Sequence, residues 1–299
     1  MKYAYYPGCS LHATGLEYDL STRQVAKHLG IELWEIPDWN CCGASAAHNT
    51  NHTLAVALPA RNLAIAEQEG LDVAVPCAAC FNRMRAAQAA ARNSEAMRQT
   101  INDIIGMDYR ASNETCALLD IMVNRVGLET IAEKVVKPLT GLKVAAYYGC
   151  LLVRPPEITG FDDPENPQSM DRLVASLGGT PVDWPFKIEC CGAGHTTTRP
   201  DIASRLLYRI YSGAAAAGAD CLVSACPLCF LNLDMRQEQV GREHNASFSL
   251  PVFYFTELMG LAFAYAPKDL GINRHFVPVA PLLESKELLR HPVTRREET

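Results

Sequence analysis

The sequence predicts an α/β protein made of two pseudo-repeated, Rossmann-like domains, each built on a parallel sheet. One observation behind this is the alternation of short β-prone runs with helix-compatible segments, most of them closed by glycine or proline. The other is a repeat in which ten of the twelve cysteines form two copies of one pattern, namely Cys9, Cys41, Cys42, Cys77 and Cys80, then Cys150, Cys190, Cys191, Cys226 and Cys229. A repeat of this length indicates two similar domains rather than a solenoid of short units.

The first domain is placed in residues 1–140. Its expected elements are a strand at 2–6, a helix at about 15–28, a strand at 31–36, a helix at about 54–69 and a strand at 71–75. Residues 81–138 have few strong breaks and are expected to form a helical connection between the domains. Each cysteine group follows a predicted strand, and ligand sites in open α/β sheets form beyond the carboxyl ends of the strands. The spacing therefore favours convergence of the three groups.

The second domain, residues 141–299, repeats this order. Its expected elements are a strand at 142–148, a helix at about 201–217, strands at 220–224 and 252–255, and then a helix and a polar tail with partial disorder. The copies are offset by 141 residues at the isolated cysteine and by 149 residues at the other two groups. A difference of eight residues in one loop accounts for this change, and the second copy has a proline-containing loop at 154–168.

The composition and net charge of the chain argue against several classes of function. The net charge is -6 and the sequence pI is about 5.8, which disfavours a general nucleic-acid binder. The amino terminus lacks the apolar core of a signal peptide, and no run approaches the roughly 20 apolar residues that span a bilayer. We therefore expect a cytoplasmic protein with no membrane span and with reduced thiols. In that setting a cysteine pattern indicates metal binding or catalysis more often than structural disulfides.

The number of cysteines in each copy limits what they hold. Structural zinc takes four ligands, often from two CxxC pairs, and a cubane iron–sulfur cluster also takes four thiolates. Each copy here has five cysteines: one CxxC, one adjacent pair and one isolated residue. Either one cysteine is a redox-active bystander, or the bound group is larger or more open than a cubane. Packing as small hydrophobic residues does not explain why the adjacent pair recurs with an identical 34-residue gap to the CxxC.

The two triplets Cys41-Cys42-Gly43 and Cys190-Cys191-Gly192 carry a family resemblance. With their flanking cysteines, they resemble the doubled CCG motif of the B subunit of heterodisulfide reductase, over nearly the whole chain. The resemblance implies two non-cubane [4Fe-4S] clusters, each held by the five cysteines of one copy. It also implies a catalytic subunit in which a disulfide lies between the clusters. Each cluster would supply one electron and capture one sulfur at an iron.

The resemblance also implies partners and a substrate class. The partners would be a ferredoxin-like C subunit with cubane clusters and a flavoprotein A subunit. This chain shows no dinucleotide-binding fingerprint or phosphate loop of its own. The substrate would be a heterodisulfide such as that of coenzymes M and B. For a bacterial-type homologue, which we favour, it would be a sulfur-oxidation intermediate on a lipoate-type carrier. The competing interpretation is a non-catalytic electron-relay or zinc-binding scaffold subunit.

Three residues outside the cysteines are candidate catalytic groups. His48 and His195 follow the two adjacent pairs closely and are candidate proton donors, because histidine titrates near neutral pH. Arg154 follows Cys150 and is a candidate for neutralising charge on the substrate or cluster. A hydrogen-bonded or solvated loop residue is the alternative for each. Cys116, on a predicted helix, and Cys221, on a predicted strand, are expected to pack in the core.

Overall fold

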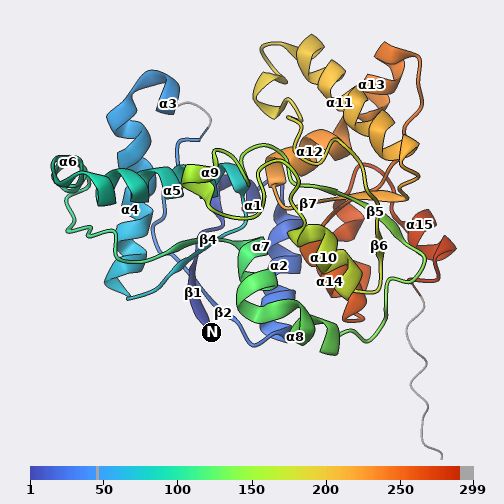
Figure 1. The fold of residues 1–299 in the computed structure, drawn as a ribbon, viewed down its shortest axis with the longest axis horizontal. Helices are drawn as coiled ribbons and strands as arrows, with labels where there is room; N and C mark the ends of the chain where they lie inside the picture. Colours follow the sequence, from blue (N-terminus) through green and yellow to red (C-terminus); the bar gives the residue numbers. More distant parts are fainter. Residues whose placement is uncertain (45–46, 290–299) are drawn as a thin grey trace, which may run out of the picture.

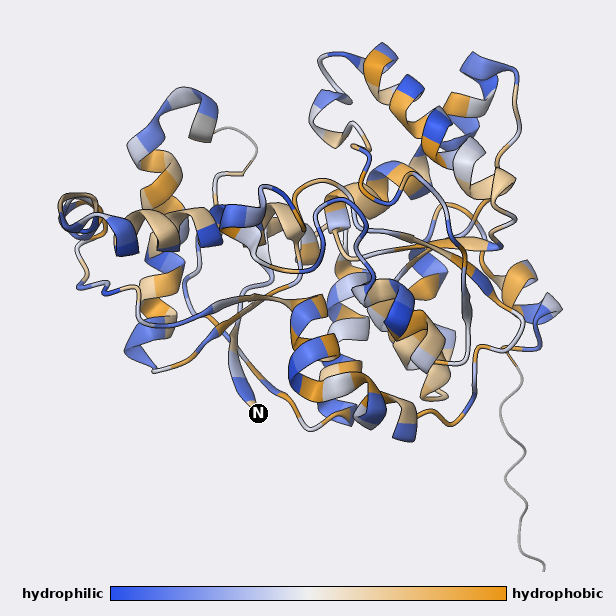
Figure 2. Cartoon of the chain, viewed as in Figure 1, coloured by the Kyte–Doolittle hydropathy of each residue, from blue (hydrophilic) through white to orange (hydrophobic). Residues whose placement is uncertain are grey.

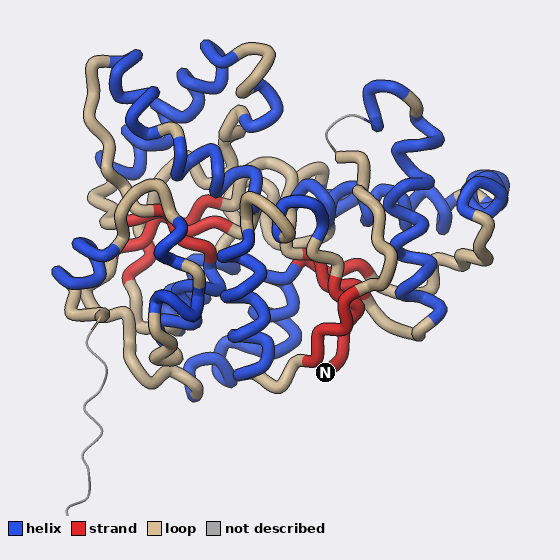
Figure 3. The backbone as a smooth tube through the Cα atoms, turned by 180° about the vertical axis from the view of Figure 1, so that it is seen from behind, coloured by secondary structure: helices blue, strands red, loops and turns tan. Residues whose placement is uncertain are grey.

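The computed structural model describes residues 1–44 and 47–289, and it contains two parallel four-stranded sheets (Figures 1 and 3). The first sheet has the order β2-β1-β3-β4, with β1 Lys2–Tyr5, β2 Glu32–Glu35, β3 Val73–Val75 and β4 Thr115–Ala117. The second has the order β6-β5-β7-β8, with β5 Lys143–Tyr147, β6 Thr180–Pro181, β7 Cys221–Ser224 and β8 Val252–Tyr254. The predicted fold class, two repeated parallel α/β units, is confirmed.

Helices surround both sheets. Those of the first half are α1 Gly8–Leu11, α2 Leu16–His28, α3 Ala47–Thr50, α4 His52–Gln68, α5 Ala78–Asn93, α6 Glu95–Ile105, α7 Leu118–Asp120, the π-helix η1 Ile121–Gly127 and α8 Leu128–Glu133. Those of the second half are α9 Pro156–Thr159, α10 Ser169–Ser176, the 3₁₀ turn η2 Ala193–His195, α11 Pro200–Ala216, α12 Pro227–Met235, α13 Gln237–His244, α14 Phe255–Ala262, the 3₁₀ turns η3 Pro267–Leu270 and η4 Ile272–Arg274, and α15 Ala280–Ser285. Helix α11 illustrates the amphipathic pattern that packs such helices: apolar and polar residues alternate along it (Figure 2), and Leu207, Ile210 and Tyr211 are buried.

The helical connection predicted at 81–138 is wrong in one respect, because it contains a fourth strand. β4 pairs in parallel with β3, with Ala74 opposite Cys116. Cys116 therefore lies in a strand rather than on the predicted helix, and it is buried, as is Cys221 in β7. The strand spans three residues, too few to show a period of two, and its pairing with β3 defines it. The tail predicted after the helix that follows 252–255 contains η3, η4 and α15, and only residues 290–299 of it lie outside the described residues.

Helices of each half pack against helices of the other half at their junction. Helix α2 of the first half packs on α14 of the second, and α10 of the second packs on α7, η1 and α8 of the first. Buried apolar residues of both halves form one continuous core. Among the described residues, no helix is both long and apolar enough to cross a membrane.

Candidate functional site

Three adjacent strands in each sheet deliver one cysteine group each. In the first sheet the adjacent pair follows β2, Cys9 follows β1, and the CxxC follows β3. The order β6-β5-β7 repeats this in the second sheet. Because the strands are parallel, their carboxyl ends lie at one edge, and the five cysteines of each copy meet there. We call the first five-cysteine set module 1 and the second module 2.

The thiols approach one another in the same way in both modules. In module 1 the Sγ atoms of Cys42 and Cys80 are 3.1 Å apart, and the Gly43 amide donates to Cys41 Sγ at 3.4 Å. In module 2 the Cys191 and Cys229 Sγ atoms are 3.5 Å apart, and the Gly192 amide lies 3.3 Å from Cys190 Sγ. Backbone N–H groups aimed at sulfur stabilise thiolates, the form that binds metal.

The glycine of each triplet has a steric role. Gly43 and Gly192 have φ of 73° and 75°, a conformation that other residues adopt only with strain. A Cβ on Gly43 would lie 2.7 Å from the Ala47 Cβ, and one on Gly192 would lie 2.8 Å from the Ala203 Cα. The glycine therefore lets a helix pack directly against the turn that carries the adjacent cysteines.

A tyrosine in each half fixes the position of the adjacent pair. The Tyr6 hydroxyl donates to the Asn40 carbonyl at 2.9 Å, and the Tyr147 hydroxyl donates to the Glu189 carbonyl at 2.5 Å. Each accepting residue immediately precedes a cysteine pair. These tyrosines were not predicted as site residues, although the recurring Tyr-x-Gly-Cys run at both positions was a visible signal.

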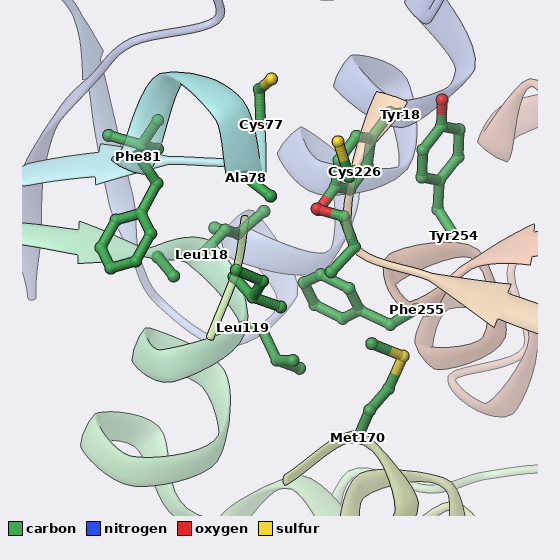
Figure 4. Close-up of a cluster of buried hydrophobic side chains, with 14 of the residues drawn as sticks. Tyr18, Cys77, Ala78, Phe81, Leu118, Leu119, Met170, Cys226, Tyr254 and Phe255 are labelled. Atoms are coloured by element: carbon green, nitrogen blue, oxygen red, sulfur yellow. The ribbon is translucent and has the colours of Figure 1, made fainter. Parts of the chain in front are cut away.

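The two modules meet at the first cysteines of their CxxC motifs (Figure 4). The Tyr18 hydroxyl lies 3.4 Å from the carbonyl oxygens of both Pro76 and Ala225, which directly precede Cys77 and Cys226. A hydrogen bond with the Cys226 thiol is the largest cause that raises the pKa of Cys77 well above its usual value. The first cysteines of the two CxxC motifs are therefore neighbours across the junction of the halves.

A second link joins the CxxC helix of the first half to the isolated-cysteine loop of the second. Asn82, two residues after Cys80, is buried, and its amide donates to the carbonyls of Leu151 and Arg154 at 3.3 and 2.8 Å. This contact holds the loop that carries Cys150. Sequence reasoning missed Asn82 because its partners lie about 70 residues away.

A cavity of about 560 Å³ opens beside module 2. All five module 2 cysteines line it, together with Ala44, Asn49, Ala78 and Ala79 of the first half. Leu151 and Leu228 also line it and are exposed at about two-fifths of their surface. The arrangement places the thiols of one module and the CxxC helix of the other around one space.

Comparisons with known proteins agree with this geometry. A family model described as a cysteine-rich domain, CCG, matches residues 3–85 and 144–234, which contain all ten module cysteines. This chain belongs to the CCG family. It is 34% identical, over 94% of its length and 99% of the relative, to the 8-methylmenaquinol:fumarate reductase membrane anchor subunit of Wolinella succinogenes. It is 29% identical, over 92% of its length and 94% of the relative, to the B subunit of the ferredoxin:CoB-CoM heterodisulfide reductase of Methanosarcina mazei.

A solved structure shares the fold. The crystal structure of a hypothetical protein from Helicobacter pylori matches 93% of this chain at a TM-score of 0.74 and 14% sequence identity. The chain spans 52% of that protein. The CCG relatives with names are subunits of redox enzymes, so this chain is a redox-enzyme-associated subunit by family. The predicted resemblance to the B subunit of heterodisulfide reductase is confirmed.

The electrostatics of the CCG motifs favour thiolates at defined positions. Hydrogen bonds from the Cys41 and Cys80 thiols lower the pKa of Cys42 to about 3. A hydrogen bond from Cys150, with the Gly192 amide and the charge of His195, lowers the pKa of Cys190 to about 6. In each module these contacts favour the thiolate form of one cysteine of the adjacent pair. Metal ligation by cysteine requires such deprotonation.

The donor set suits an iron–sulfur group. Five thiols converge in each module from three strands, and soft thiolates are the usual ligands of iron–sulfur clusters. Within the part of the chain that the structure describes, no three His, Cys, Asp or Glu side chains surround a point suited to a single metal ion. The glycines before the isolated cysteines leave room at the sulfurs, since a Cβ on Gly149 would lie 3.1 Å from Cys229 Sγ.

The three candidate catalytic residues lie in different settings. His195 ends η2, is exposed, and is close enough to Cys190 for its charge to act there. The Arg154 guanidinium donates to the Pro164 carbonyl and pairs with Glu165 at 2.8 Å. His48 belongs to α3, and its side chain lies outside the described residues.

Proposed function

We propose that this chain is the catalytic iron–sulfur subunit of a heterodisulfide reductase-like complex, in which it exchanges two electrons with a thiol/disulfide substrate. The observation that carries the proposal is the cavity of about 560 Å³ at the junction of the halves. The five thiols of module 2 line this cavity. Ala78 and Ala79 of the CxxC helix of the other module line it too.

Each module would hold one non-cubane [4Fe-4S] cluster through its five cysteines. When bound, such clusters exchange electrons one at a time, and two of them match the two electrons of a disulfide bond. The position of Tyr18 supports this assignment, because its hydroxyl lies 3.4 Å from the carbonyls of both Pro76 and Ala225, the residues that directly precede Cys77 and Cys226. Both modules would then serve one substrate.

Apolar residues of the cavity would position the substrate, and polar residues near the cysteines would supply protons. Leu151 and Leu228 offer apolar surface at the cavity wall, which favours the carbon chain of a thiol or disulfide. His195 is the proposed proton donor, because it is exposed to solvent and close to Cys190. We also propose that Arg154 neutralises charge on the substrate or the cluster, and that His48 supplies protons.

Electrons would come from partner subunits. Two relatives are named as B subunits of ferredoxin-dependent heterodisulfide reductases. By analogy we propose a ferredoxin-like C subunit and a flavoprotein A subunit, in a cytoplasmic complex. The substrate would be a heterodisulfide of the coenzyme M–coenzyme B type or a sulfur-oxidation intermediate on a lipoate-type carrier.

A second candidate function rests on the relative from Wolinella succinogenes. That protein is named as the membrane anchor subunit of a menaquinol:fumarate reductase, and it matches this chain at 34% identity over 99% of its length. In this alternative the chain would relay electrons in a membrane-attached respiratory complex, and the cavity would face a quinol instead of a disulfide.

The two functions are distinguished by purifying the chain without oxygen, measuring iron and zinc, and recording EPR spectra with a thiol or a quinol. The first proposal predicts about eight iron atoms per chain and a spectrum that changes when a substrate thiol is added to the oxidised protein. A response to quinol alone would support the second. Zinc in place of iron would refute both and favour the scaffold interpretation.

A further inference from the structure

A buried acidic cluster lies behind module 2, formed by Glu17 of α2, Glu257 of α14 and His275, which follows η4. Glu17 and Glu257 are 4% and 0% exposed, and the His275 side chain is 1% exposed. Buried ionisable groups lower the stability of the folded protein unless they are paired. None of these groups touches the cavity, so the proposed catalytic function does not explain them.

The hydrogen bonds of this acidic cluster allow its protonation state to change while its structure is kept. His275 Nε2 bonds to Glu257 Oε1 at 2.9 Å, and Glu257 Oε2 accepts the Tyr254 amide at 2.8 Å. His275 Nδ1 is buried without a hydrogen-bond partner. That nitrogen can therefore gain or lose a proton while the bond to Glu257 remains in place.

The cluster also has a route to water. Arg274, half exposed, lies 3.5 Å from Glu17 Oε2 through its Nε. Glu17 is therefore the member of the cluster nearest the solvent. A proton that arrives from solvent would therefore reach Glu17 first, because Glu257 and His275 are closed off from water.

One layer of aromatic rings separates the cluster from the CxxC motifs. Phe230, the residue after Cys229, meets the His275 ring edge-on at 4.9 Å. Tyr254 stacks on Phe230 and on Tyr18, in each case with ring centroids 4.0 Å apart, and Figure 4 shows Tyr254 and Tyr18 beside Cys226. Charges interact strongly across such apolar layers because little water screens them.

The charges that face His275 come from several elements. Glu257, Asp234 of α12 and Glu17 act on it, and Arg274 lies at the rim. Burial lowers the pKa of His275, but Glu257 and the other two carboxylates outweigh burial and raise it overall. Burial, helped by Glu257, raises the pKa of Glu17. The pKa values of His275 and Glu17 are therefore both above their ordinary values.

We propose that Glu17, Glu257 and His275 form one protonation site that takes a proton from solvent when module 2 accepts an electron. The proposal rests on the proposed function, since it needs a redox centre at the cysteines. One electron arrives from a one-electron donor protein, and one proton arrives from water at the Arg274 rim. The N–H or O–H bond formed in the Glu17–Glu257–His275 group replaces an O–H bond of hydronium, which becomes water. The added positive charge offsets the added negative charge of the reduced centre.

The test is the pH dependence of the midpoint potential of the iron-loaded chain, followed by absorbance and EPR in a dye-mediated titration. The potential of one module should fall with rising pH, by up to about 59 mV per pH unit for one proton per electron. His275→Gln and Glu257→Gln should flatten this dependence. His28→Gln is the matched control, because His28 also stacks on an aromatic ring between α2 and the second half, near Phe263 and Tyr265, and it should leave the dependence unchanged.

The outcomes separate the two proposals. A chain that binds no iron, or shows no reversible reduction, refutes the proposed function and the coupling that rests on it. A normally loaded chain with a pH-independent potential refutes the coupling alone, as does an unchanged dependence in both variants. If neither variant loads with iron, Glu17→Gln at the solvent rim provides the same measurement with less disturbance of the core.

Discussion

Replacing Gly192 by alanine tests whether the glycine of the CCG motif is needed for packing as well as for backbone conformation. Gly192 has φ of 75°, and its Cβ would lie 2.8 Å from the Ala203 Cα. The left-handed conformation costs a non-glycine residue about 1–2 kcal/mol. Forcing α11 away from the new methyl group adds about 1–3 kcal/mol.

Gly218→Ala is the matched control, because Gly218 has φ of 72° and nothing within 4 Å of its Cβ position. The Gly218→Ala variant therefore has only the energetic cost of the left-handed backbone conformation, without a steric clash. Urea denaturation should show that Gly192→Ala lowers the free energy of unfolding by about 1–3 kcal/mol more than Gly218→Ala. Iron content and the EPR signal of one module should fall only in Gly192→Ala. Equal losses in the two variants would show that packing against α11 is not the reason for this glycine.

Three further predictions concern contacts around the modules. Asn82→Ala removes two partly buried hydrogen bonds and should lower the free energy of unfolding in urea by about 1–3 kcal/mol. The Cys150 thiol should then react faster with a disulfide reagent, and an unchanged rate of labelling would refute the role of Asn82 in holding this loop. Tyr147→Phe leaves the Glu189 carbonyl without its hydrogen bond and should lower the free energy of unfolding by about 1–3 kcal/mol. One module should also lose iron, and an unchanged EPR spectrum would contradict this prediction. The raised pKa of His275 means that its stabilising contribution is complete below pH about 6.5 and is lost as pH rises through the folded-state pKa. Urea denaturation of wild type and His275→Gln across this range should diverge at low pH and converge at high pH, and parallel curves would contradict the assignment.

The repeat of strands and cysteines was predictable because both signals are local. A β-prone run followed by Pro7-Gly8 or Gly149 marks a strand end, and the cysteine after it marks the site edge. The strand at Thr115–Ala117 was missed because its identity depends on pairing with β3 and on burial, neither of which three residues display. The roles of Asn82 and Tyr18 were missed for a related reason: the partners of Asn82, and one of the two partners of the Tyr18 hydroxyl, lie in the other half of the chain.

These long-range contacts also explain why two modules occur in one chain. Helix α2 buries Tyr18 and Ser21 against the second half, where Tyr18 stacks on Tyr254 and the Ser21 hydroxyl lies 2.7 Å from that of Thr256. An isolated first half would expose this face to water and would leave Asn82 without its partners. An isolated second half would lose the amide that holds its Cys150 loop. The two halves therefore stabilise each other through α2 and α14, and the first half also holds the loop that carries Cys150 of the second.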